Sequence, residues 1–244
     1  MARRSVIDDV TETIAFQIAS GAFQVGEHLP SIRQLAVRYE INPATVQQVL
    51  GRLRSAGFVE VHQGLGAVVR DVRLYGGIET WRYLFRFSGR LPGLAAQIVA
   101  EVLETKRLYV RLVLTSISEN PGRYDLAPFD RAVRSFELLA RGGDATPQDL
   151  HKATLHLLRT CMSITERGIG LGVLNSVGGM LGEVPEVLGV VYADPEAAAW
   201  WWRHLVTTAS SGALDQDSIA LLLTLLNDWD TEITLRLQDV LQEH

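Results

Sequence analysis

Residues 42–66 read NPATVQQVLGRLRSAGFVEVHQGLG and begin with a strong helix start. Asn accepts hydrogen bonds from the free amides of a first helical turn, and proline at the first helical position loses no useful donor. The apolar residues that follow recur with helical spacing at Val46, Val49, Leu50 and Leu53. Gly57 ends this helix, and residues 58–69 predict two strands joined by a glycine-rich turn, which is a β-hairpin.

Two further helices are predicted upstream of this stretch. From Ser5 to Ser20, apolar residues recur at steps of three and four, with acidic residues in the first turns. Ser31 can cap a short helix that runs to Tyr39. Three short helices followed by a β-hairpin are the order of a winged helix-turn-helix, in which the helix starting at Asn42 enters the major groove of DNA.

Beyond residue 73 the pattern predicts helices only, so we expect a mainly α protein in which a winged helix-turn-helix precedes an all-α bundle. The predicted domains are a DNA-binding domain at 1–73, a linker at 74–78 around Gly76-Gly77, and an effector-binding and dimerisation domain at 79–244. The clearest helices of this last domain are expected at 94–114, 130–141, 146–165, 194–211 and 217–242.

Composition agrees with two domains and narrows the class of protein. The net charge of the 244 residues is −5, but residues 1–73 carry eight Arg and seven acidic residues, so this segment is nearly neutral. The single cysteine, Cys161, excludes an intrachain disulfide and a thiolate metal cluster. No uninterrupted apolar run reaches the about 18 residues of a membrane helix, so we expect a cytoplasmic protein without a membrane partner.

The motifs GEHLPSIRQLA at 26–36, NPATV at 42–46, GFVEV at 57–61 and GLG at 64–66 resemble the DNA-binding domain of the GntR superfamily. The all-helical remainder is similar to that of the FadR-like members, which are two-fold dimers whose bundle binds a small effector. Two weaker motifs, Leu174-Asn175 and YADPEA at 192–197, resemble the effector domain of the fatty-acid-responsive FadR type. The resemblance implies a homodimer on double-stranded DNA with a palindromic operator.

The same resemblance implies a set of DNA-contacting residues: Arg33, Asn42, Ala44, Thr45 and Gln47 in the helices, and Gln63 and Gly64 at the tip of the wing. Gln48, on the same helix as Gln47, is a further candidate from its side-chain chemistry alone. Glutamine side chains can pair with adenine, and short side chains such as Ala44 and Thr45 let the helix approach a thymine methyl group. Pro43 and Gln47 stand where fatty-acid-responsive relatives carry arginine, and Gln63 replaces a histidine. The operator sequence of those relatives is therefore not transferred.

Many FadR-like bundles resemble metal-binding domains that use an Asp and three His. The candidates here are His151, His156 and His204. Five helical residues turn the chain by about 140°, so His151 and His156 cannot face one ion. We therefore expect no metal and no cofactor, and hydrogen-bonded or surface histidines.

An anionic organic effector is the better expectation for the bundle, because cations can sit on otherwise apolar helices. The expected contacts are Lys106, Arg107, Tyr192, Trp201 and Arg203. The alternative for each cation is a surface position over the core. An acyl-CoA, which needs a deep apolar tunnel, competes as effector with a small carboxylate, which needs a compact polar pocket.

The main hypothesis is thus a ligand-controlled DNA-binding regulator of lipid or other carboxylate metabolism, a repressor whose operator affinity falls when the effector binds. The alternative is a DNA-binding dimer whose bundle only dimerises or binds another protein. An enzyme is disfavoured, because neither Cys161 nor the scattered histidines form a nucleophile–base pair.

Overall fold

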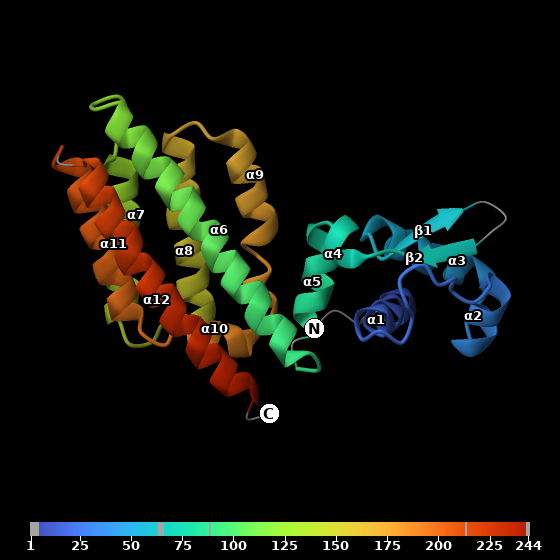
Figure 1. Cartoon of the computed structure of the whole chain (residues 1–244). Helices are drawn as coiled ribbons and strands as arrows, with labels where there is room; N and C mark the ends of the chain where they lie inside the picture. Colours follow the sequence, from blue (N-terminus) through green and yellow to red (C-terminus); the bar gives the residue numbers. More distant parts are fainter. Residues whose placement is uncertain (1–4, 63–65, 88, 213, 243–244) are drawn as a thin grey trace. The chain divides into compact units, whose positions relative to one another are not determined.

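The computed structural model describes residues 5–62, 66–87, 89–212 and 214–242. They form two compact units, Met1–Ala95 and Ala96–His244, which are described separately below (Figure 1). The first is a winged helix-turn-helix and the second an all-helical bundle, so the expected fold class is confirmed.

Three capped helices build the first unit: α1 (Val6–Ala19), α2 (Ile32–Arg38) and α3 (Pro43–Ser55). Ser5 and Ser31 each form a capping box with the side chain three residues on. Asn42 caps α3 by accepting a 2.8 Å hydrogen bond from the backbone N–H of Thr45. Because each cap satisfies amides that the first turn leaves free, the helices begin where the sequence predicts.

The wing is an antiparallel hairpin of β1 (Val59–His62) and β2 (Gly66–Val69), with Val59 opposite Val69. The loop before α2 adds a short pairing to it, since His28 forms an isolated bridge with Val68. The core of the unit consists of side chains from all these elements, including Ile14, Leu35, Val49, Leu53, Phe58 and Val69.

Two helices after the wing also pack in the first unit: α4 (Val72–Tyr75) and α5 (Ile78–Arg86). The Thr80 hydroxyl of α5 donates to the carbonyl of Ala56 at the end of α3. The rings of Phe16 and Phe87 meet edge to face at 5.3 Å. This unit therefore extends to Ala95, past the expected linker at 74–78, because apolar and hydroxyl side chains of α5 are buried against α1 and α3.

Gly57 shows why the chain turns sharply between α3 and the wing. Its φ is +88°, a region that L side chains rarely adopt, and a Cβ there would lie 3.1 Å from the Thr80 hydroxyl oxygen. Glycine thus permits both the turn and the close approach of α5.

The bundle contains the helices α6 (Pro92–Glu119), α7 (Ala127–Arg141), α8 (Pro147–Ile164), α9 (Gly168–Val177), α10 (Pro185–Val191), α11 (Pro195–Ser210) and α12 (Gln216–Gln242). The five predicted helices all occur, with ends that differ by a few residues. Helix α6 continues past its predicted end, whereas α9 and α10 lie where no helix was singled out. In the described parts of the chain, no helix is long and apolar enough to span a membrane.

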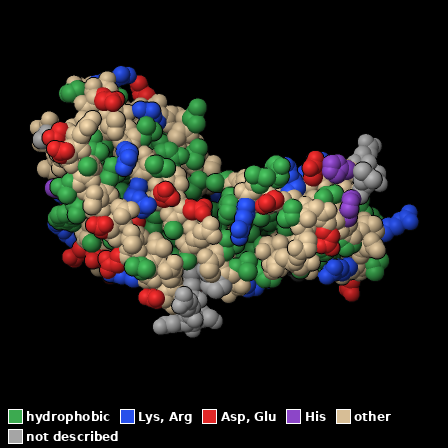
Figure 2. Space-filling model, viewed as in Figure 1, with side chains coloured by type: hydrophobic (Ala, Val, Ile, Leu, Met, Phe, Trp, Pro, Cys, Tyr) green, Lys and Arg blue, Asp and Glu red, His purple; other side chains and the backbone are tan. Residues whose placement is uncertain are grey.

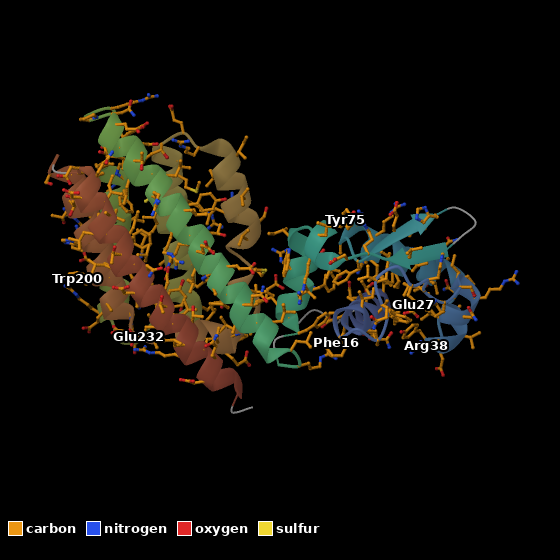
Figure 3. The ribbon with its side chains drawn as sticks, in the orientation of Figure 1. Phe16, Glu27, Arg38, Tyr75, Trp200 and Glu232 are labelled. Atoms are coloured by element: carbon orange, nitrogen blue, oxygen red, sulfur yellow. The ribbon has the colours of Figure 1, made fainter. Side chains whose placement is uncertain are left out.

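The three consecutive tryptophans of α11 divide between core and surface, as about 100° of rotation per residue requires. Trp201 and Trp202 are buried, whereas Trp200 is 59% exposed and stacks on His204. Figure 3 labels Trp200 at the outer edge of the bundle.

Candidate nucleic-acid interface and ligand pocket

A groove lies between α2, α3 and the wing of the first unit. Its lining includes the side chains of Arg33 from α2, Gln47 and Arg54 from α3, and His62 from β1. All four are exposed. Arg and Gln are the side chains that contact phosphates and base edges in protein–DNA complexes. This groove is therefore the candidate interface for DNA.

The structure places the predicted DNA contacts in two groups. Arg33, Ala44, Gln47 and Gln48 are exposed and available. The side-chain oxygen of Asn42 is taken by the cap of α3, where it also accepts a 3.0 Å hydrogen bond from the Thr45 hydroxyl. Asn42 and Thr45 therefore stabilise the first turn of α3. Because the Asn42 side-chain oxygen and the Thr45 hydroxyl bond each other, they are less available for contacts with DNA than the sequence suggested. Gln63 and Gly64 lie outside the described residues.

Arg54 and His62 were not predicted as site residues, although they line the same groove. A signal for Arg54 is present in the sequence, since it stands seven residues after Gln47 and shares its helix face. His62 reaches the groove only through the pairing of β1 with β2, which sequence spacing does not show.

The second unit contains an apolar cavity lined by α6 and by α8 to α12. Its volume is about 80 Å³. Its lining is mostly aliphatic and aromatic, with the tryptophans Trp201, Trp202 and Trp229, and its other polar side chains are Thr105, Lys106, Tyr109, His151, Thr154 and Tyr192. A mostly apolar cavity with a few polar groups is typical of a small-molecule site.

One cation of this cavity belongs to a buried charge cluster. Asp230 of α12 is 1% exposed and accepts hydrogen bonds from Lys106 at 2.6 Å and from Arg107 at 2.9 Å. Lys106 lines the cavity and lies 5.5 Å from the centre of the Trp229 ring, whereas Arg107 is outside the lining. Two cations share one carboxylate, so the cluster has a formal charge of +1 at the cavity wall.

A second polar group is formed by His151 of α8 and Tyr192, which follows α10. The His151 Nδ1 lies 3.1 Å from the Tyr192 hydroxyl, and its Nε2 lies 2.9 Å from the carbonyl oxygen of Gly178. Burial lowers the pKa of His151 and raises that of Tyr192, so both are neutral near pH 7. Of the three histidines considered as metal ligands, His151 thus serves in hydrogen bonds.

No three His, Cys, Asp or Glu side chains are grouped as a metal site within the described residues. Of the predicted effector contacts, the structure brings Lys106, Tyr192 and Trp201 together in one cavity. The indole N–H of Trp201 donates to the carbonyl of Leu222, so only its ring faces a ligand.

Arg203 lies outside the cavity lining and joins α11 to α7. Its guanidinium contacts Glu137 at 2.5 Å and Asp130 at 2.6 Å. Hydrogen bonds from Arg203 are the main cause that lowers the pKa of both carboxyls. These contacts give Arg203 a role in helix packing, in place of the ligand contact expected from the sequence.

We expect the Arg203→Met variant to lose stability in a pH-dependent way. Since the folded-state pKa values of Asp130 and Glu137 lie below their unfolded values, their contribution is complete above about pH 5 and is lost as the pH falls through the lowered values. Urea unfolding should therefore separate variant and wild type at pH 7 and bring them together near pH 3. Arg134→Met is the control, because Arg134 pairs with Asp130 from an exposed position. An equal loss at both pH values would show that Arg203 acts only through its packing.

Comparison with known proteins adds to this geometry. Residues 7–69 match the family model described as bacterial regulatory proteins, gntR family. The chain is 40% identical over 105 residues to the HTH-type transcriptional regulator Mce2R of Mycobacterium tuberculosis, which is 43% of this chain and 42% of that protein. Another HTH-type transcriptional regulator of M. tuberculosis is 42% identical over 69 residues, or 28% of each protein. The matches thus cover less than half the length of these relatives.

Among solved structures, the fold is similar to that of Lar, which controls the expression of the Listeria monocytogenes agr system and mediates virulence. The TM-score is 0.56 at 14% identity, over 97% of this chain and 98% of that one. This likeness concerns the fold alone. The curated relatives above are named as transcriptional regulators.

Proposed function

We propose that this protein, whose residues 7–69 form a DNA-binding domain of the gntR family, is a cytoplasmic transcription regulator that binds a palindromic operator as a homodimer. The observation that carries the proposal is the groove between α2, α3 and the wing, where Arg33, Gln47 and Arg54 are exposed together. In this docking mode α3 lies in the major groove, and the side chains of α2 contact the adjacent backbone.

The proposal includes the FadR-like type of bundle, whose ligand controls DNA binding. The cavity supports it, because a bundle that only dimerises needs no space lined by six elements. The excess positive charge at Lys106 favours an organic acid. When a carboxylate binds Lys106, Arg107 can keep Asp230 paired, so no buried charge is left alone.

The size of the cavity favours one of the two effector classes that the sequence allows. At about 80 Å³, the cavity is smaller than the roughly 300–1,000 Å³ of a typical small-molecule site. This room suits a compact acid or a short acyl chain. A long acyl-CoA would require the surrounding helices to move apart, so we propose a compact apolar acid as the effector.

Exposed apolar side chains of the bundle support the homodimer. Leu108 and Leu112 share one face of α6, and Ile169 and Val173 share one face of α9, where Ile169 is 88% exposed. Figure 2 shows hydrophobic side chains on the visible face of the bundle over α9. A two-fold interface would remove such side chains from water.

Selection from random double-stranded DNA with the full chain tests the proposal. We expect enrichment of an inverted repeat whose half-sites are spaced by about one helical turn, bound by two chains per duplex in native mass spectrometry. The Leu108→Asp/Leu112→Asp variant should bind the selected DNA as single chains, and Leu138→Asp, a change of an exposed leucine on α7, should leave the stoichiometry unchanged. Failure to enrich any sequence would contradict the proposed function.

A further inference from the structure

Helix α6 carries a stripe of exposed side chains on the side away from the cavity. It includes Glu104, Leu108, Arg111 and Leu112, and Leu108 is 59% exposed. Since each residue turns the helix by about 100°, these four lie within about 100° of one another around the axis. Lys106, which lines the cavity, lies about 160° from Leu108. Another protein surface can therefore cover this stripe without entering the cavity.

The two charges of the stripe are not used within the chain. Glu104 and Arg111 lie about 10 Å apart along the helix axis, one on each side of Leu108. Neither side chain forms an ion pair or a hydrogen bond in the parts of the chain that the structure describes. Their neighbour Arg107, in contrast, binds Asp230. The stripe thus has an apolar centre, with an unpaired negative charge on its N-terminal side and an unpaired positive charge on its C-terminal side.

This order of charges is complementary to its own reverse. When a two-fold axis near Leu108 relates two antiparallel copies of α6, Glu104 of each copy faces Arg111 of the other. Two ion pairs then form, one on each side of the axis, and the Leu108 side chains meet between them. Packed helices lie about 8–10 Å apart, which the long side chains of Glu and Arg can span. A parallel pair of helices would instead bring like charges together.

We propose that α6 packs antiparallel against α6 of a second copy of this chain, with a Glu104–Arg111 ion pair on each side of Leu108. The inference rests on the proposed function, which requires a homodimer but does not say how the two chains meet. The leucines contribute the apolar area that is removed from water. The ion pairs fix the direction and the register of the helices, because a shift of either helix separates the opposite charges.

Sedimentation equilibrium of the full chain tests the inference through charge reversal. Glu104→Arg and Arg111→Glu should each raise the dissociation constant of the dimer at least about 10-fold, because each turns two attractive pairs into two like-charge contacts. The double variant Glu104→Arg/Arg111→Glu should restore the wild-type constant, since it only exchanges the two charges. The matched control is Arg131→Glu, which makes the same change of charge at an exposed position of α7 and should leave the constant unchanged.

A mixture of the two single variants gives a second and independent measurement. In the mixed dimer one chain has two positive charges on its stripe and the other has two negative charges, so both pairs attract. Native mass spectrometry of an equal mixture should therefore find more mixed dimer than random pairing gives. Because the exchanged side chains are exposed, the circular dichroism spectra and melting temperatures of the separate chains should show normal folding.

Any of three results would overturn the inference: the single reversals leave the dissociation constant unchanged, the double variant dimerises as weakly as the single ones, or the mixture pairs at random. If the chain is still a dimer in these cases, the homodimer of the proposed function stands and only the arrangement of α6 is wrong. A wild-type chain that stays single in solution and on the selected DNA would contradict the homodimer and the inference together.

Discussion

Replacing Asp230 by Asn should lower the free energy of unfolding by about 3 kcal/mol, the largest loss that we expect from a single charge in the bundle. The Asp230 side chain is 1% exposed and is the shared partner of Lys106 and Arg107. The amide of Asn keeps the shape but not the charge, so two cations that are 15% and 24% exposed lose their counterion. A charge left unpaired in a largely buried place is costly, because water no longer solvates it fully.

Urea unfolding at pH 7 measures this loss, and Asp228→Asn is the matched control. Asp228 lies on the same helix but is exposed, so its change should stay within about 0.5 kcal/mol. Lys106→Met should cost less than Asp230→Asn, because Arg107 still neutralises the carboxylate. Equal stability of Asp230→Asn and Asp228→Asn would mean that the cluster does not hold α6 and α12 together.

The sequence predicted the first three helices well because their ends are decided locally. The hydroxyl or amide oxygens of Ser5, Ser31 and Asn42 each bond an amide three residues away, which is visible as a short motif. The hairpin was predicted for a similar reason, since its turn and its alternating apolar residues are neighbours in the chain.

The sequence did not show that the first unit continues beyond the predicted linker at 74–78. Gly76-Gly77 has the composition of a linker, but Gly76 packs tightly, since a Cβ there would lie 2.2 Å from the carbonyl oxygen of Val72. Helix α5 then buries Thr80 and Phe85 in the first unit. The Thr80 hydroxyl, for example, donates to the carbonyl of Ala56, 24 positions earlier in the chain, and no local pattern encodes such a contact.

The site residues of the bundle were predicted only in part for the same reason. Lys106 could be proposed from its place on an apolar helix, but its partner Asp230 is 124 residues away in the chain. Arg203 has the same local features as Lys106, yet its carboxylate partners lie on α7 and hold it outside the cavity.

The second large effect is expected at the DNA groove, where Arg33→Ala should weaken binding to the selected operator by about 10- to 100-fold, or roughly 1–3 kcal/mol. Arg33 is exposed in the first turn of α2 and lines the groove with Gln47 and Arg54. Its guanidinium forms no ion pair with the residues that the structure describes. The variant should therefore fold normally, and its circular dichroism spectrum and melting temperature should match the wild type.

The salt dependence of binding reveals which part of DNA Arg33 contacts. If it binds a phosphate, Arg33→Ala should reduce the slope of log affinity against log salt by about one and weaken all sequences alike. If it binds a guanine edge, the loss should be confined to the operator, and one base position should become less specific. Arg38→Ala is the control, because Arg38 lies about 140° around α2 from Arg33 and is absent from the groove lining. Fluorescence anisotropy of labelled operator at several salt concentrations measures both quantities. A loss for Arg38→Ala as large as that for Arg33→Ala would contradict the docking of α3 and the first turn of α2 on DNA, because residues on two sides of α2 cannot both face the groove.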